Sequence, residues 1–593
     1  MQVPTGRRFA LLLGLMACLP TAQAQWSKAA STNAVLSGGS GEEVQVKLAP
    51  ASDGTTFVSF YDSDPAGSPA FGYDVVLQRL DPAGSELWPH GGITVADRGY
   101  SSTQDYGLDA GPNGDAWLAF RDDRFVGDQI TAARVAADGT LVWGVNGVQL
   151  TSTTEFVASP RIAATDDGGC VVGWTQGSTT RLQKLDASGA PQWGGGVAIP
   201  VAVGETASLS SLGRSEGGAV ILSWISQSGG FFGPRHLLAQ KLSSTGAPQW
   251  PGASVPVFTS GSLQLGNFPP LVTDGAGGAL FSWYGTGPLQ CYAQHVRSDG
   301  SQSFGVAGTG VEVSTNATQI RVSPSLAYNQ STDEAFVFWV EQNSLQSLRG
   351  VSGQKLDGAG NRLWGPGGIE FVPLGGEDPS QVSTVISGGG AAVAFTAGPG
   401  FGQDEVRALR VDSAGVLQHA IVTIASTPSS KDDVAIAAGP FGDTFVAWHG
   451  DENGGGNDVL AQNLLPGGGL GPAAGGLSHT AGANLDSLAA TVGALGGNLD
   501  LQLDLTTSGY PFGAVFGYLA PAVLPFGGDV ILVDFTGLEL LGLPVGVGPV
   551  ASWSLPLPAS PVLCGLPVYT QGVHADLAQP LRLSNAVDVY LGL

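Results

Sequence analysis

The sequence has few charged residues, and basic ones are especially scarce. Only 12% of its 593 residues are Asp, Glu, Lys or Arg, so long solvated helices are not expected. Twenty-four Lys and Arg stand against 49 Asp and Glu. The resulting net charge of −25 argues against nucleic acid or an anionic membrane as a partner. After residue 24 no apolar run approaches the roughly 20 residues that a transmembrane helix needs.

Cysteine and catalytic signatures are scarce as well. Beyond the N-terminal segment the chain keeps Cys170, Cys291 and Cys564, an odd number whose spacing matches neither a disulfide framework nor a zinc motif. We expect buried, unreactive thiols. The sequence contains no His-x-x-x-His pair, no Gly-x-Ser-x-Gly elbow and no phosphate-binding glycine loop. It therefore predicts no organic cofactor.

The first 24 residues have the pattern of a secretory signal peptide. A short basic segment precedes an apolar run over 9–19, and Ala22-Gln23-Ala24 is a small-x-small cleavage site. We expect cleavage after Ala24 and a secreted or cell-surface product. The alternative is a lipoprotein, because residues 15–18 resemble a lipoprotein box that would anchor the chain at Cys18.

The chain is rich in glycine, with 91 residues, and it contains an internal repeat. A Gln is followed ten positions later by an aromatic residue, as in Gln183 and Trp193 or Gln240 and Trp250. A fixed internal spacing is typical of repeat architectures. Within each unit, four short apolar runs are separated by Gly-rich turns, which predicts a four-stranded antiparallel sheet.

The aromatic residue at the end of each second run marks eight units of about 55 residues: Phe60, Phe120, Trp174, Trp224, Trp283, Trp339, Phe395 and Trp448. The eighth unit lacks a fourth run after Gln462, and residues 26–36 could supply it. A β-propeller closes its ring in this way. We therefore predict an all-β, eight-bladed β-propeller over 25–472, with seven blades or an open β-solenoid as alternatives. The aromatic and Gln columns are expected to be structural, the Gln bonding backbone of the adjacent blade.

Residues 473–593 follow a Gly-rich linker and have a different pattern. Leu499 to Leu505 alternates strictly between apolar and polar residues, which indicates a strand with one buried face. Further short runs are separated by Gly and Pro turns. We predict a small C-terminal β-sandwich.

Two regions of the chain resemble known bacterial families. Residues 354–365, Gln-Lys-Leu-Asp-Gly-Ala-Gly-Asn-Arg-Leu-Trp-Gly, resemble the β-propeller repeats of bacterial secreted proteins. Residues 524–528, 565–571 and 583–586 resemble a C-terminal β-sandwich module of large secreted proteins in environmental bacteria such as planctomycetes. The resemblance implies an architecture, and an attachment, sorting or accessory role for the module. It implies no activity, because propellers host many.

The polar loops between the second and third runs of each unit are the predicted functional site. Their length varies, and function is often located in variable loops on a rigid scaffold. Carboxylate and amide oxygens there could bind a ligand or Ca²⁺, which prefers oxygen ligands; the alternative is ordinary solvated turns. The candidate residues are Asp62, Asp64, Asp122, Asp123, Asp451, Glu452, Asn453, Asn457 and Asp458.

These features favour a secreted, monomeric, non-catalytic binding protein whose ligand is a glycan, a protein or a surface matrix. One alternative is a polysaccharide hydrolase or lyase, which needs two carboxylates, or a His or Tyr base, converging at the mouth of the central channel. Another is a structural component of the cell envelope. Converging acids with raised pKa values would favour the enzyme, and an aromatic or amide-lined surface would favour binding.

Overall fold

The structure is a computed structural model that describes residues 26–39, 41–63, 72–99, 105–400, 402–452, 454–560 and 563–592. The predicted signal peptide and Cys18 lie outside these residues. The described part consists of β-strands and short 3-10 turns, such as η2 (Glu216–Gly218) and η3 (Leu505–Thr507). None of it forms a helix of the length and apolarity that crossing a membrane requires.

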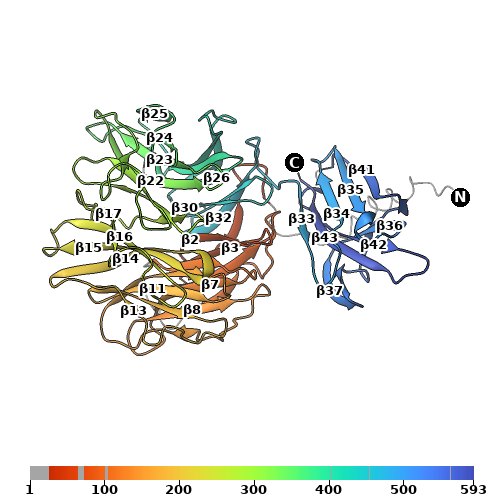
Figure 1. Cartoon of the computed structure of the whole chain (residues 1–593). Helices are drawn as coiled ribbons and strands as arrows, with labels where there is room; N and C mark the ends of the chain where they lie inside the picture. The colour runs from red at the N-terminus through yellow and green to blue at the C-terminus, as the bar shows by residue number, and fades with distance from the viewer. Residues whose placement is uncertain are drawn as a thin grey trace.

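Eight four-stranded antiparallel sheets follow one another along the described chain (Figure 1). The first sheet contains β2 (Glu43–Pro50), β3 (Thr56–Asp62), β4 (Asp74–Leu80) and β5 (Ile93–Ala96). The second contains β6 (Gly107–Ala110), β7 (Ala116–Asp122), β8 (Gln129–Val135) and β9 (Val148–Gln149). The third contains β10 (Val157–Ala164), β11 (Cys170–Gln176), β12 (Thr179–Leu185) and β13 (Val197–Ala198). The fourth and fifth are β14 (Glu205–Arg214), β15 (Val220–Ser228), β16 (Arg235–Leu242) and β17 (Val255–Phe258), and β18 (Leu271–Thr273), β19 (Ala279–Tyr284), β20 (Cys291–Val296) and β21 (Val311–Glu312). The sixth contains β22 (Ile320–Asn329), β23 (Glu334–Gln342), β24 (Arg349–Leu356) and β25 (Ile369–Gly375). The seventh contains β26 (Ser380–Ser387), β27 (Gly390–Ala397), β28 (Asp404–Val411) and β29 (Val422–Ser429). The eighth contains β30 (Lys431–Ala438), β31 (Thr444–Gly450), β32 (Asp458–Leu464) and β1 (Ala34–Ser37).

The eighth sheet is assembled from both ends of this region. β1 pairs antiparallel with β32, with Ala34 opposite Ala461 and Val35 opposite Leu460. The first strand of each sheet contacts the first strand of the next, and β30 of the eighth sheet contacts β2 of the first. The order of the sheets therefore returns on itself, in a propeller-like arrangement.

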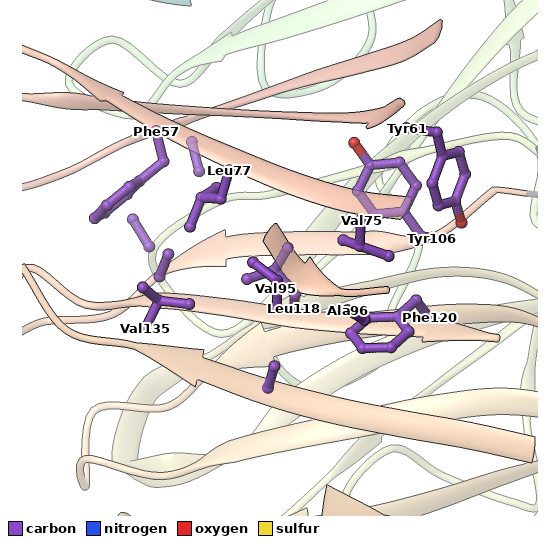
Figure 2. Packing of buried hydrophobic residues seen from close by; sticks show 14 of the residues in the cluster. Phe57, Tyr61, Val75, Leu77, Val95, Ala96, Tyr106, Leu118, Phe120 and Val135 are labelled. Atoms are coloured by element: carbon purple, nitrogen blue, oxygen red, sulfur yellow. The ribbon is translucent and has the colours of Figure 1, made fainter. Parts of the chain in front are cut away.

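Apolar faces of neighbouring sheets pack against each other. Figure 2 shows Phe57, Val75 and Leu77 of the first sheet beside Leu118 and Phe120 of the second, all fully buried. Burying a side chain of this size contributes about 1.5–3 kcal/mol. The eight aromatic residues that mark the repeats all lie in second strands and are buried, so this column is a packing element.

A second aromatic column joins each sheet to the next. Trp193 of the third sheet donates from Nε1 to the carbonyl of Ser244 in the fourth, and it lies over Gly246. The packing of a ring over a glycine recurs at all eight junctions: Trp26 with Gly84, Trp88 with Gly139, Trp143 with Gly189, Trp193 with Gly246, Trp250 with Gly300, Phe304 with Gly360, Trp364 with Gly415, and His419 with Gly468. Trp26 thus serves the junction between the eighth sheet and the first.

The Gln column is structural, but its bonds lie mainly within one sheet. Gln240 Oε1 accepts hydrogen bonds from the backbone N–H of Lys241 and of Trp250, each at 2.9 Å, and its Nε2 donates to the Gly252 carbonyl. The predicted bond to an adjacent sheet is found for Gln354, whose Nε2 reaches the Val313 carbonyl at 3.3 Å. The amide therefore mainly ties the third strand to the turn that follows it.

Residues 475–590 form a separate set of sheets, the C-terminal module (Figure 1). Its strands are β33 (Gly475–His479), β34 (Leu488–Val492), β35 (Asn498–Asp504), β36 (Phe512–Tyr518), β37 (Pro521–Phe526), β38 (Asp529–Val533), β39 (Glu539–Gly542), β40 (Gly546–Val547), β41 (Val550–Pro556), β42 (Pro567–Ala575) and β43 (Arg582–Tyr590). One sheet has β33, β43, β42 and β36, with β39 and β40 both on β36; another has β34, β35 and β41. Leu499, Leu501 and Leu503 of β35 pack with Val587 and Val589 of β43 in one core.

The module contacts the first and eighth sheets at the end opposite to the loops between second and third strands. The Phe441 and Tyr590 rings are 5.8 Å apart, and Leu477 lies against Gly54. Phe441 and Gly54 both belong to turns between first and second strands. The opposite end of the sheets carries the predicted site.

Candidate functional site

We call the end of the sheets where second strands lead into third strands the loop face. The connections from each sheet to the next lie at the same end, because the strands alternate in direction. First strands begin there with a β-bulge in several sheets, and a non-glycine residue in each bulge has positive φ: Gln45, Ser159, Ser323, Gln381 and Asp433. Bulges and strained φ values are frequent beside functional sites.

Three of the predicted residues, Asp62, Asn457 and Asp458, come together around Glu43 where the eighth sheet meets the first. Asp62 lies opposite Glu43 in the β2–β3 register, and the Glu43 N–H donates to the Asn457 carbonyl at 2.7 Å. Burial, followed by the charges of Asp62, Asp458 and Glu42, raises the pKa of Glu43 to about 8. Glu43 is therefore protonated at neutral pH. The sequence pattern missed it, because only the contact between the first and eighth sheets brings residue 43 beside residue 458.

The acids of the second sheet are already paired. Asp122 is buried and accepts hydrogen bonds from Arg124 Nε and an Arg124 terminal nitrogen at 2.9 and 2.8 Å. Asp123 accepts from the Gly99 N–H at 3.0 Å. These carboxylates hold their own loop.

The long loop of the eighth sheet is similar. Asp451 accepts from the Gly454 N–H at 2.8 Å, while Glu452 lies 2.9 Å from Lys431 Nζ and accepts from Trp448 Nε1. Asp64 and Asn453 lie outside the described residues. In the described part of the chain, no three His, Cys, Asp or Glu side chains are grouped so as to hold a metal ion. Calcium binding stays a prediction.

One acid–base pair lies at the start of the eighth sheet. Asp433 Oδ2 is 3.4 Å from His449 Nδ1. Burial raises the pKa of Asp433 and lowers the pKa of His449. The two groups are close but form no hydrogen bond here, since His449 Nδ1 is buried without a hydrogen-bond partner, so proton exchange between them would need a small movement. The sequence analysis listed neither residue as a candidate.

The loop face also carries exposed phenylalanines. Phe231 and Phe232, in the loop between β15 and β16, are 63% and 94% exposed, and their rings meet edge to face at 5.2 Å. Phe156 and Phe268 are also exposed and lie in connections that lead to the third and fifth sheets. Within the eight sheets as described, every exposed phenylalanine lies at this end. A sequence signal existed for one pair: Phe231 and Phe232 are flanked by glycines and belong to no strand pattern.

Comparison with known proteins gives distant structural neighbours. No protein-family model matches the chain, and a search of curated proteins found no match. Similar solved structures include a PL25 ulvan lyase bound to -[GlcA(1-4)Rha3S]- (12% identity, 66% of this chain and 94% of that chain, TM-score 0.39). Others are a protein of unknown function from Dyadobacter fermentans (8%, 74% and 98%, 0.36) and the α-L-arabinanase of Penicillium chrysogenum with arabinobiose (11%, 75% and 99%, 0.30). Scores this low transfer no function.

Proposed function

We propose that residues 25–472 form an eight-bladed β-propeller, that residues 473–593 form a β-sandwich, and that the chain is a secreted, non-catalytic binding protein. Its loop face binds an extracellular glycan or protein. Eight successive sheets and eight equivalent aromatic–glycine junctions support the propeller. Two sheets that share one core support the sandwich.

The observation that carries the binding function is the set of exposed phenylalanines on the loop face. Apolar surface left in water forgoes about 25 cal/mol for each Å². Contiguous exposed apolar surface in a folded protein commonly marks an interaction site. The predicted acids Asp122, Asp123 and Glu452, in the loops of the second and eighth sheets, are paired with Arg, Lys or backbone N–H groups, so much of their charge is already neutralised within the chain. Ring faces pack well against the apolar side of a sugar or a protein side chain.

Binding is tested on a glycan array and by pull-down with extracellular proteins, using the chain from residue 25 onwards. We expect a ligand whose binding falls at least about 10-fold in Phe231→Ala/Phe232→Ala, which corresponds to about 1.4 kcal/mol. Phe535→Ala in the C-terminal module is the matched control, since Phe535 is 51% exposed. Equal loss in the control, or no loss in the double variant, would contradict the proposal.

The second candidate is a polysaccharide hydrolase or lyase, and the Asp433–His449 pair is the observation that favours it. Glu43 also has a raised pKa, but its side chain is only 2% exposed and cannot touch a substrate in this geometry. Release of reducing ends or unsaturated products from a polysaccharide, abolished by both Asp433→Asn and His449→Ala, would establish catalysis. Binding without turnover would exclude it for that polysaccharide.

A further inference from the structure

A cavity of about 160 Å³ lies at the junction of the second and third sheets. Its walls include Ser152, Thr153, Trp174, Gln176 and Arg181. It adjoins the loop face, because the Gly177 N–H, next to Gln176, donates to the carbonyl of the exposed Phe156 at 2.9 Å. At about 30 Å³ for each water, the cavity has room for about five, enough for an acid group and part of a sugar ring.

Arg181 has no partner in this cavity. Its Nε is buried without a hydrogen bond, and none of the residues that the structure describes forms an ion pair with its guanidinium. A guanidinium has five N–H donors, and a desolvated donor left unpaired is costly. The buried Nε–H of Arg181 therefore lacks an acceptor.

The seventh sheet shows which acceptor this position takes. Arg407 occupies the same place in the repeat: it lies opposite Phe395 on the second strand, as Arg181 lies opposite Trp174. Arg407 is held by both carboxylate oxygens of Glu377, at 2.6 and 2.8 Å, and by Glu405 at 2.9 Å. A two-pronged guanidinium–carboxylate contact is among the strongest polar contacts in proteins.

The third sheet does not supply these carboxylates to Arg181. Glu377 stands four residues before the bulge residue Gln381, and Glu155 stands four residues before the bulge residue Ser159. Glu155 instead accepts from Gln176 Nε2 at 2.6 Å. The place of Glu405, two residues before the arginine, is taken by Thr179, whose hydroxyl donates to the Ile199 carbonyl.

We propose that this cavity binds one carboxylate or sulfate group of an extracellular ligand, which Arg181 holds as Arg407 holds the carboxylates of Glu405 and Glu377, with the free Nε–H in the place that bonds Glu405. Ser152 and Thr153 line the same space with hydroxyl groups that can donate, and Trp174 supplies an apolar wall. The net charge of −25 opposes the approach of polyanions, so the ligand carries one or two charges. This inference rests on the proposed binding function and names the ligand chemistry as an acidic sugar residue.

Calorimetry with the chain from residue 25 onwards tests the site with three probes: methyl β-glucuronide, the neutral methyl β-glucoside, and inorganic sulfate. We expect the glucuronide to bind and the glucoside not to bind. Arg181→Gln should weaken the glucuronide about 10-fold or more, as loss of a charged two-pronged contact does. Sulfate that binds and competes with the glucuronide supports the shared oxyanion chemistry, whereas sulfate that binds while the glucuronide does not would overturn the sugar assignment.

Arg407→Gln is the matched control. It should keep glucuronide binding but lower the melting temperature, because it leaves the carboxylates of Glu377 and Glu405 without their ion-pair partner. Arg181→Gln should leave the melting temperature unchanged or raise it. A fall equal to that of Arg407→Gln would show a structural role and overturn the proposal, as would equal binding of glucuronide and glucoside. The phenylalanine variants are measured separately, so a negative result for Arg181 does not decide whether the loop face binds a ligand.

Discussion

The glycines at the sheet junctions are constrained both by their backbone conformation and by the ring packed against them, as Gly246 shows. Its φ is +82°, and a Cβ atom there would lie 3.1 Å from Trp193 and 2.9 Å from Val197. The first constraint concerns the backbone alone, since L side chains disfavour positive φ. The second concerns the packing of the neighbouring sheet's tryptophan.

We expect Gly246→Ala to lower the free energy of unfolding by about 2–4 kcal/mol, the sum of backbone strain and overpacking. Gly204→Ala is the control, because Gly204 has φ +85° and open space around its Cβ position. It should cost only about 1 kcal/mol. Urea unfolding of both variants measures the difference. Equal losses would show that the tryptophan contact sets no constraint.

Glu43 predicts a pH dependence at the junction of the first and eighth sheets. Its pKa is about 8 in the fold and near 4.5 when unfolded, so the folded state holds an extra proton between these values. Stability contributed by this group is therefore full at low pH and is lost as pH rises toward 8. One pKa unit corresponds to about 1.4 kcal/mol.

In Glu43→Gln the side chain stays neutral, so the variant should gain at least about 1 kcal/mol relative to the unmodified chain between pH 5 and pH 8.5. Thermal unfolding at both pH values measures the gain. Glu86→Gln is the control, since Glu86 lies in the turn at the opposite end of the first sheet and pairs with His90. A constant difference between Glu43→Gln and the unmodified chain across this range would contradict a proton held in the fold.

At the scale of elements, strand β1 and Trp26 act as one closing device. Trp26 is 2% exposed, its ring lies 5.1 Å from Phe445, and its Nε1 donates to the Pro82 carbonyl. Trp26 thereby joins the eighth sheet to the first, while β1 completes the eighth sheet beside β32. Losing Trp26 should release the strand that follows it.

Trp26→Ala should cost about 3–5 kcal/mol, as other buried Trp truncations do. Hydrogen exchange should then accelerate in β1 and β32 first. Trp88→Ala is the matched control, because Trp88 fills the same position at the next junction, within a continuous chain. It should cost a similar amount without accelerating exchange in β1. Exchange in β1 that is equal in the two variants would argue against a terminal closure.

The repeat pattern was enough to predict the strands, the aromatic columns and the pairing of the N-terminal strand, because each depends on local spacing. The pattern does not reveal Glu43 or Arg181, because their environments depend on residues that neighbouring sheets place beside them. Arg181 and Arg407 share one repeat position, and only the surrounding carboxylates distinguish them. Among the acids predicted to bind a ligand, Asp122 pairs with Arg124 of its own loop, a contact that the spacing of the repeat does not predict.

At the scale of the whole molecule, the C-terminal module covers the turn end of the first and eighth sheets and leaves the loop face uncovered (Figure 1). Ionisable groups of the module lie beside this contact, and the charge of Asp53 in the first sheet acts on His479. Burial raises the pKa of Asp588 to about 7 and lowers the pKa of His479, whose Nδ1 lies 3.8 Å from an Asp588 oxygen. Docking is therefore linked to protonation.

Asp588 holds a proton in the docked state up to about pH 7, whereas an exposed aspartate loses it near pH 4. Docking should therefore weaken as pH rises through this interval. His479 has the opposite dependence at low pH, so the comparison is made between the unmodified chain and Asp588→Asn, which share that histidine. We expect Asp588→Asn to remain docked more fully, with an advantage that grows from pH 5 to pH 7.5 and then levels off.

Solution scattering measures docking through the radius of gyration, and protease cleavage of the linker at 465–474 checks it. Asp576→Asn is the control, since Asp576 is half-buried in the turn after β42 and accepts a hydrogen bond from the Ala578 N–H. An advantage that does not change with pH would show that the buried carboxyl group does not control how the module is held.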